Sequence, residues 1–163
     1  MPSLLIVYYT RTGNTEEMAR IIGEGAGEVS DVEVAVQSVA DTTVDDVLAA
    51  DGVIMGSPVY YGTMAADLKR LIDESIKYHG KLAGKVGGAF ATSANRGGGS
   101  ETTVMDIVKA LMIHGMVVQG TAQGAHYGPV AVGAPDKLAR EDCLRYGRQT
   151  AELVKRLTGD SPA

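Results

Sequence analysis

Short apolar runs alternate along this chain with stretches in which apolar residues recur at helical spacing. The first run, residues 4–9, is continuously apolar, which is typical of a strand buried on both faces of a sheet. A polar loop follows, and then Met18, Ile21 and Ile22 mark one face of a helix. Alternation of this kind predicts an α/β domain with a parallel sheet and right-handed crossovers.

The rest of the chain repeats this pattern. Further strands are expected at residues 32–39, 53–55, 86–91 and 116–118, and helical stripes cover residues 64–72, 104–112 and 144–157. Five strands in 163 residues predict a three-layer sandwich, in which a five-stranded parallel sheet of order 2-1-3-4-5 carries helices on both faces. Because no linker or repeat divides the chain, residues 1–163 are expected to form one domain, with a frayed tail over residues 159–163.

Composition and charge exclude several classes of protein. The net charge of −5 argues against a nucleic-acid binder, which needs a basic surface. Cys143 is the only cysteine, so neither an internal disulfide nor a cysteine-held metal cluster is expected, and no metal-ligand spacing is present. The chain has no long apolar run and begins without a basic leader segment, which predicts no membrane insertion and a cytoplasmic location.

The loop after the first strand is the most informative segment. It reads Thr10, Arg11, Thr12, Gly13, Asn14 and Thr15, and it opens a helix. Its hydroxyls and the helix N-terminal amides together predict an anion cradle, and the glycine lets the backbone approach a phosphate. No Lys-Ser/Thr follows the glycine, so the loop is not a nucleoside-triphosphate P-loop. The alternative is an ordinary capped helix start.

This segment resembles the flavodoxin signature, which the chain matches from Ile6-Val7-Tyr8 through Thr10, Gly13 and Thr15 to Ala19 and Ile22. The resemblance implies a flavodoxin-like fold that binds flavin mononucleotide (FMN), with the first loop around its phosphate. A second glycine-rich stretch, residues 23–27, looks like a dinucleotide motif but follows no strand. We expect it to be a closely packed helix terminus instead.

Two further loops at the expected carboxyl ends of strands complete the candidate cofactor site. The second contains Pro58, Val59, Tyr60, Tyr61 and Gly62, and at least one of its tyrosines is expected to contact the flavin ring. The third contains Thr92, Ser93, Ala94, Asn95, Arg96, Gly97 and Gly98, whose backbone amides have room to reach the pyrimidine edge of the ring. The alternatives are one tyrosine in the core and one in solvent, and a flexible glycine connector. Residues 122–135 form a fourth loop at the same edge.

The third loop, with Ser57-Pro58 and His114-Gly115-Met116, is similar to the NAD(P)H:quinone oxidoreductase branch of the flavodoxin-like superfamily, the tryptophan-repressor-binding-protein family. That family is longer, has His-His-Gly where this chain has Ile113-His114-Gly115, and has a tryptophan over its quinone site. This chain has no tryptophan; Tyr78 and His79 are the nearest candidates, and His126 and Tyr127 could line the site instead. Each histidine could equally be solvated or cap a helix, and for His114, near a helix end, we favour this reading. Cys143 is expected to be a buried packing residue.

Two functions remain open. One is an enzyme in which FMN takes electrons from NAD(P)H and passes them to a quinone or another small acceptor. The other is a flavodoxin-type carrier that exchanges electrons with protein partners. Arg96 and Tyr127 are candidates for tuning the flavin, because a cation near the ring stabilises the negative charge gained on reduction. We favour the enzyme and leave a homo-oligomer open.

Overall fold

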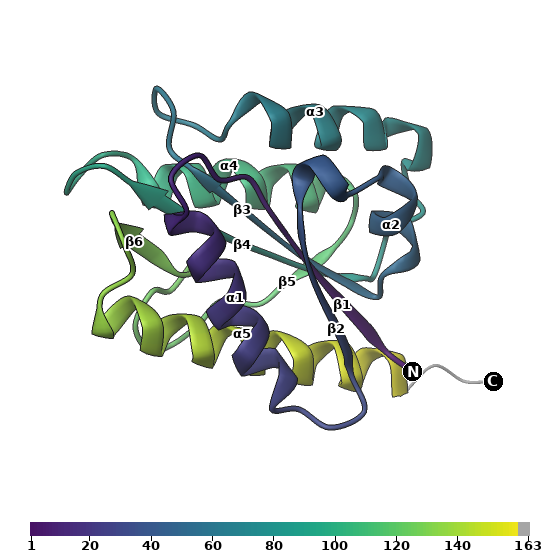
Figure 1. Cartoon of the computed structure of the whole chain (residues 1–163). Helices are drawn as coiled ribbons and strands as arrows, with labels where there is room; N and C mark the ends of the chain where they lie inside the picture. Colours follow the sequence, from purple (N-terminus) through teal and green to yellow (C-terminus); the bar gives the residue numbers. More distant parts are fainter. Residues whose placement is uncertain (160–163) are drawn as a thin grey trace.

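A parallel sheet lies between two layers of helices in the computed structural model, which describes residues 1–159 (Figure 1). Its strands are β1 (Ser3–Tyr8), β2 (Glu33–Ser38), β3 (Gly52–Pro58), β4 (Val86–Ser93), β5 (Val117–Val118) and β6 (Val130–Val132). The order β2-β1-β3-β4-β5 confirms the predicted order, and each pair of neighbouring strands in it is parallel. The carboxyl ends of β1, β3 and β4 therefore meet at one edge of the sheet.

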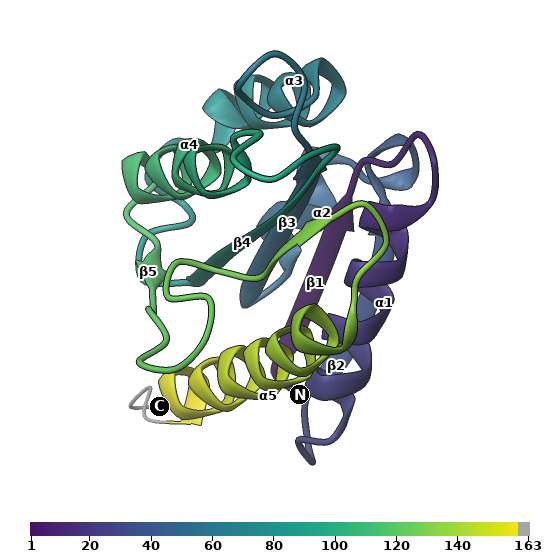
Figure 2. The same ribbon diagram turned by 90° about the vertical axis from the view of Figure 1, so that its left-hand side faces the viewer.

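The helices are α1 (Asn14–Gly27), α2 (Val44–Ala49), α3 (Ala66–Glu74), α4 (Ser100–Ile113) and α5 (Lys137–Gly159), with short 3₁₀ turns η1 (Val39–Asp41) and η2 (Ser75–Tyr78). Figure 2 shows α1 and α5 on one side of the sheet and α3 and α4 on the other. This arrangement confirms the predicted three layers. No helix among residues 1–159 is long and apolar enough to cross a membrane.

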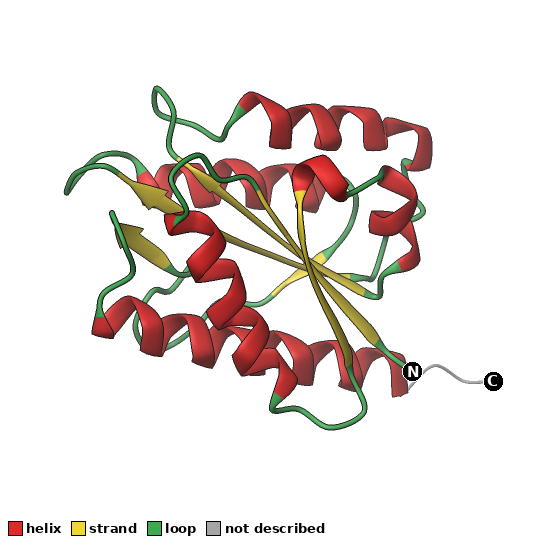
Figure 3. Cartoon of the chain, in the orientation of Figure 1, coloured by secondary structure: helices red, strands yellow, loops and turns green. Residues whose placement is uncertain are grey.

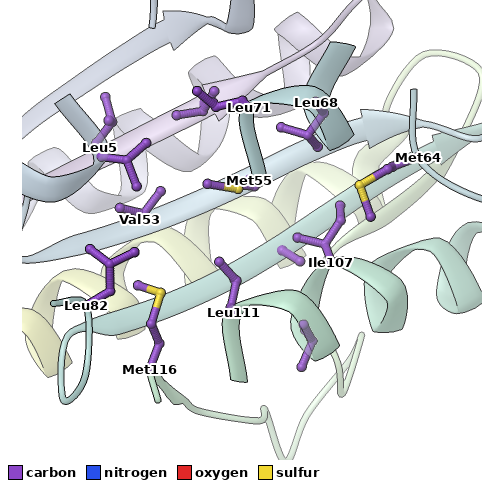
Figure 4. Close-up of a cluster of buried hydrophobic side chains, with 14 of the residues drawn as sticks. Leu5, Val53, Met55, Met64, Leu68, Leu71, Leu82, Ile107, Leu111 and Met116 are labelled. Carbon is purple, nitrogen blue, oxygen red and sulfur yellow. The ribbon is translucent and has the colours of Figure 1, made fainter. Parts of the chain in front are cut away.

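Side chains that alternate along each strand separate the core into two layers. Leu5 and Val7 of β1, with Val53 and Met55 of β3, face the helices α2, α3 and α4 (Figure 4). Leu4 and Ile6 point the other way and pack against α1 and α5. Both faces of β1 and β3 are thus buried, which explains why their sequences are continuous apolar runs.

Glycines allow the closest contacts in the second layer. A Cβ added at Gly25 of α1 would overlap the backbone carbonyl of Leu144, and one added at Gly147 of α5 would overlap that of Ile22. The two helices therefore cross almost backbone to backbone. This geometry confirms that the glycine-rich stretch 23–27 is a closely packed helix end rather than a nucleotide motif.

The fifth position of the sheet differs from the predicted single strand. β5 pairs with the start of β4 and β6 with its end, and residues 119–129 run between them outside the sheet (Figure 3). Within the described part of the chain, the middle of β4 consequently pairs with no strand on that side. The buried hydroxyl of Tyr146 fills the gap, because it accepts the Ala89 N–H at 3.0 Å. α5 also holds the inserted segment, with Gln149 donating to the Gly120 carbonyl at 3.0 Å and Arg145 to the Gln123 carbonyl at 3.1 Å.

Other boundaries also depart from the sequence prediction. The short α2, both 3₁₀ turns and β6 were not predicted, and α5 begins at Lys137, seven residues before the apolar stripe that indicated it. Gly159 is the last residue of α5 rather than part of a frayed tail. The remaining tail, residues 160–163, lies outside the described residues.

Candidate functional site

A cavity of about 490 Å³ opens at the carboxyl edge of the sheet, where the loops after β1, β3 and β4 converge. Its lining residues come from all three predicted loops and from the turn after β6. They are Arg11, Thr12, Asn14, Thr15, Pro58, Val59, Tyr60, Thr92, Ser93, Ala94 and Gly133. The volume lies within the range of ligand pockets, roughly 300–1,000 Å³.

The first loop is shaped so that the N-terminus of α1 is left open. Gly13 occupies the N-cap position with φ 97°, a left-handed conformation that favours glycine, and no side chain caps the helix. The Gly13 N–H instead donates to Thr10 Oγ1 at 3.0 Å, which braces the turn. The first amides of α1 therefore remain available to an anion, as the anion-cradle prediction requires.

A buried bond ties the first loop to the third. Thr15 Oγ1 lies 2.8 Å from Thr92 Oγ1, and both side chains are buried. The side chain of Thr15 is thus fixed by the end of β4, whereas Thr12 is exposed at the mouth of the cavity. One hydroxyl proton bonds the two oxygens to each other, so the other hydroxyl keeps its proton for a further acceptor.

The second loop is a tight hairpin held by one serine. Ser57 Oγ accepts the Ala65 N–H at 2.8 Å, which connects the end of β3 to the start of α3. Tyr60 and Thr63 exchange backbone hydrogen bonds of 2.9 and 3.3 Å, and the residues between them have positive φ, 46° at Tyr61 and 86° at Gly62. Two central residues with positive φ are typical of a two-residue hairpin.

This hairpin separates its two tyrosines. Tyr60 lines the cavity and packs edge-on against Tyr9, with ring centroids 6.1 Å apart. Burial, followed by the nearby Tyr9, raises the pKa of Tyr60, so its hydroxyl stays protonated at neutral pH. Tyr61 is fully exposed at the hairpin tip. Tyr60 is therefore the tyrosine that a ring in this cavity would meet first.

The third loop is an ordered turn and not a flexible connector. Ser93 Oγ donates to the Asn95 carbonyl and accepts from Ser100 Oγ at 2.9 Å, and the Gly98 N–H also donates to the Asn95 carbonyl. Gly97 and Gly99 have φ of 70° and 101°, so the turn requires glycine at these positions. These bonds close the turn on itself and point residues 95–97 toward solvent.

The structure brings together only part of the predicted site. Several predicted residues do not line this cavity: Thr10, Gly13, Tyr61, Gly62, Asn95, Arg96, Gly97 and Gly98. Arg96 lines a neighbouring cavity of about 390 Å³ with the glycines and β6, and Tyr127 is half exposed on the inserted segment. Gly133 and the supporting residue Tyr9 were not predicted as site residues, although Gly133 belongs to the fourth loop expected at this edge.

The charge that lines the cavity is positive. Among residues 1–159, Arg11 is the only charged residue that lines it, and no carboxylate does. Outside the cavity, the second loop is connected to a carboxylate of α4, because Asp106 accepts from Thr63 Oγ1 at 2.8 Å. Lys109 and Thr63 hold the pKa of Asp106 below its usual range, so this carboxylate is ionised at neutral pH.

The remaining candidate side chains lie away from the cavity. His114 is buried at the C-cap of α4, where its Nε2 lies 2.7 Å from Ser75 Oγ. Tyr78 forms a hydrogen bond with Asp45. His114, Tyr78 and His79 are therefore not lining residues of the cavity. Exposed His126 bonds the Thr121 carbonyl through Nδ1. Cys143 is fully buried, which confirms its packing role, and burial raises its pKa to about 12. Residues 1–159 contain no group of three or more potential metal-ligating side chains.

Comparisons with known proteins agree with this geometry. A family model described as NADPH-dependent FMN reductase matches residues 31–127. A flavodoxin of Aquifex aeolicus is 38% identical over 94% of this chain and 88% of its own length. An iron-sulfur flavoprotein of Methanocaldococcus jannaschii is 43% identical over 69% of this chain, which spans 65% of that longer protein.

Solved structures give the same assignment. A flavodoxin-type WrbA-like protein from Agrobacterium tumefaciens superposes with a TM-score of 0.80 at 25% identity, covering 96% of this chain and 99% of its own. An archaeal flavodoxin superposes with a TM-score of 0.78 at 26% identity, covering 94% and 99%. The sheet order, the open N-terminus of α1 and these matches together show that the chain belongs to the flavodoxin-like superfamily of FMN-binding redox proteins.

Proposed function

We infer that FMN occupies the cavity of about 490 Å³ with its phosphate at the first loop and its ring between the second and third loops. The uncapped N-terminus of α1 supports this orientation, because free amides and hydroxyls suit a phosphate monoester. FMN supplies the redox chemistry when it is bound, since it exchanges electrons singly or as hydride.

The residues of this chain then position and surround the cofactor. Thr12, Thr15 and the first amides of α1 bind the phosphate, and the bond from Thr15 to Thr92 keeps that hydroxyl in place. Tyr60 covers one side of the flavin ring, and Tyr9 packs edge-on against the Tyr60 ring. From the third loop, Thr92, Ser93 and Ala94 line the cavity and would contact the polar end of the ring.

We infer further that the protein takes electrons from NAD(P)H and passes them to a quinone or another small acceptor. The observation that carries this inference is a cavity with one arginine and no carboxylate. A flavin that gains two electrons also gains negative charge, and a guanidinium beside it stabilises that charge. The match of residues 31–127 to the reductase family supports the same reaction.

A carrier function has its own support. The Aquifex flavodoxin covers nearly the whole chain, and Asp106 places an ionised carboxylate beside the hairpin through Thr63. A carboxylate close to the ring opposes the negative charge of full reduction, which suits one-electron transfer between proteins. The two functions therefore differ in whether Arg11 or Asp106 dominates the field at the ring.

Anaerobic mixing of the FMN-loaded protein with NADH or NADPH distinguishes them. Loss of flavin absorbance within the time of one enzyme turnover supports the reductase. No reaction with either nucleotide, combined with rapid reduction by a one-electron donor, would refute the reductase and support the carrier.

Substitution of the arginines tests the electrostatic argument separately. Arg11→Gln should lower the two-electron potential by about 20 mV, which corresponds to about 1 kcal/mol for an exposed charge. Arg96→Gln is the matched control, because Arg96 lies outside the cavity, and it should shift the potential less. A larger shift for Arg96 would show that the third loop, and not the first, sets the potential.

A further inference from the structure

A second cavity, of about 510 Å³, lies on the other side of the first loop from the proposed flavin site. It is bounded by the ends of β1 and β2, the turn η1, the start of α1 and one face of α3. Its lining residues are Tyr8, Tyr9, Thr10, Glu16, Ser38, Val39, Ala40, Thr42, Asp67, Arg70, Leu71 and Glu74. None of them lines the flavin cavity, so the two cavities are separate.

Part of the lining of this second cavity is aromatic and aliphatic. Tyr8 and Tyr9 form one wall, and Val39 and Leu71 contribute aliphatic surface opposite the loop. Burial and the neighbouring Glu16 raise the pKa of Tyr8, so its ring carries a neutral hydroxyl at physiological pH. The hydroxyls of Ser38 and Thr42 are used within the β2–η1 turn, where they bond Asp41 and the Ser38 carbonyl.

The charged side chains that line the second cavity are mainly negative. Glu16, Asp67 and Glu74 line the cavity, and Arg70 is the only cationic residue among the described ones that does so. Arg70 lies 3.4 Å from Asp67, and Glu16 pairs at 2.5 Å with Arg20, which is not a lining residue. Within residues 1–159, Glu74 forms neither a salt bridge nor a side-chain hydrogen bond. One carboxylate therefore faces this region without a protein cation to neutralise it.

We propose that this cavity is a second ligand site, which binds a small organic cation with an apolar or aromatic body, such as an amine or an amidine. The cationic group pairs with Glu74 and Asp67 at the α3 side, and the body packs against Tyr8 and Tyr9. A neutral or anionic molecule of the same shape gains the packing but not the charge pairing. Because the two cavities share no residue, this proposal does not depend on the electron donor or acceptor of the flavin site.

The contact between Tyr9 and Tyr60 gives the site a connection to the flavin cavity. Tyr9 lines the second cavity, and its ring packs edge-on against Tyr60, which lines the first. Thr10 also lines the second cavity, and its Oγ1 accepts the hydrogen bond from the Gly13 N–H in the first loop. A ligand at the second site thus contacts residues that shape the proposed phosphate loop.

Benzamidinium and neutral benzamide are suitable probes, because they share a ring and differ in charge. Each is titrated into the ¹⁵N-labelled, FMN-loaded protein while amide shifts are followed by NMR. Benzamidinium should shift amides of Ser38, Thr42 and Leu71 in a saturable manner without releasing FMN, and benzamide should bind at least threefold more weakly. Equal affinities, release of FMN, or shifts confined to the flavin loops would overturn the proposal.

Two variants locate the binding groups. Glu74→Gln should weaken benzamidinium binding about three- to tenfold, the contribution of one partly exposed charge. Glu152→Gln is the matched control on the exposed face of α5 and should leave it unchanged. Ala40→Arg, at an exposed position of η1, should abolish binding by placing a cation in the cavity. If Glu74→Gln and Glu152→Gln bind equally, or Ala40→Arg still binds, the site is not the one proposed.

Discussion

The hydroxyl of Tyr146 should stabilise the sheet where the fifth strand is interrupted. It accepts the Ala89 N–H at 3.0 Å in a fully buried environment, and no strand of residues 1–159 pairs with that part of β4 on the β5–β6 side. Tyr146→Phe keeps the ring but leaves a buried N–H without an acceptor. The expected loss is about 1–3 kcal/mol in the free energy of unfolding.

The pH dependence of stability gives this prediction a second signature. Burial raises the pKa of Tyr146 from the ordinary tyrosine value of 10.0 to about 12. Above pH ~10 the unfolded chain loses the phenolic proton while the folded protein retains it, so stability falls by about 1.4 kcal/mol per pH unit. The fall ends as the pH passes the folded pKa. Tyr146→Phe should lack this part of the alkaline destabilisation.

Urea unfolding at pH 7.5 and at pH 11, with saturating FMN, measures both effects. Tyr127→Phe is the matched control, because Tyr127 is half exposed on the inserted segment. Amide hydrogen exchange should also show faster exchange at Ala89 in Tyr146→Phe. Equal unfolding midpoints for the two variants at pH 7.5 would refute the role assigned to the Tyr146 hydroxyl.

Three further changes test other parts of the structure. Gly147→Ala should destabilise the protein by about 3 kcal/mol in thermal or urea unfolding, because its Cβ would overlap the Ile22 carbonyl, whereas Gly27→Ala, with no neighbour within 4 Å, should have little effect. Burial and then His79 lower the pKa of His114, so stability should decrease as the pH falls below the unfolded value of about 6.5, and His114→Phe should remove that dependence in urea titrations. Thr15→Ala should weaken FMN binding by about 1–2 kcal/mol in fluorescence titrations, with Thr102→Ala, an exposed threonine of α4, as the unaffected control.

The sequence predicted those parts of the fold whose residues carry a strong periodic signal. β1 and β3 are buried on both faces, so their apolar runs were visible, and the stripe of α4 marked one buried face. α2 was missed because six residues provide only Val44 and Val47 as buried positions, too few for a helical period. β6 was missed because its three residues lie between glycine and proline, and its pairing with β4 is decided by tertiary contacts.

For the candidate site, the sequence predicted which loops converge but not which way their side chains point. Topology alone places the loops after β1, β3 and β4 at one edge, and the cavity is found there. The direction of Arg96 depends on the hydrogen-bonded turn that Ser93 and Asn95 form, and the direction of Tyr61 depends on its positive φ. Neither feature has a periodic signature in the sequence. The Gly133 contribution likewise depends on β6, which was not predicted.

The interrupted fifth position also affects how the protein behaves in a crowded solution. A long strand at the border of a sheet exposes a row of unpaired N–H and C=O groups to which a strand from another molecule can add. Here that border is occupied by two short strands, β5 and β6, and the chain between them leaves the plane of the sheet, with α5 holding its carbonyls. An incoming strand therefore finds no uninterrupted backbone of useful length. The same segment that interrupts the sheet protects the protein from edge-to-edge aggregation on this side.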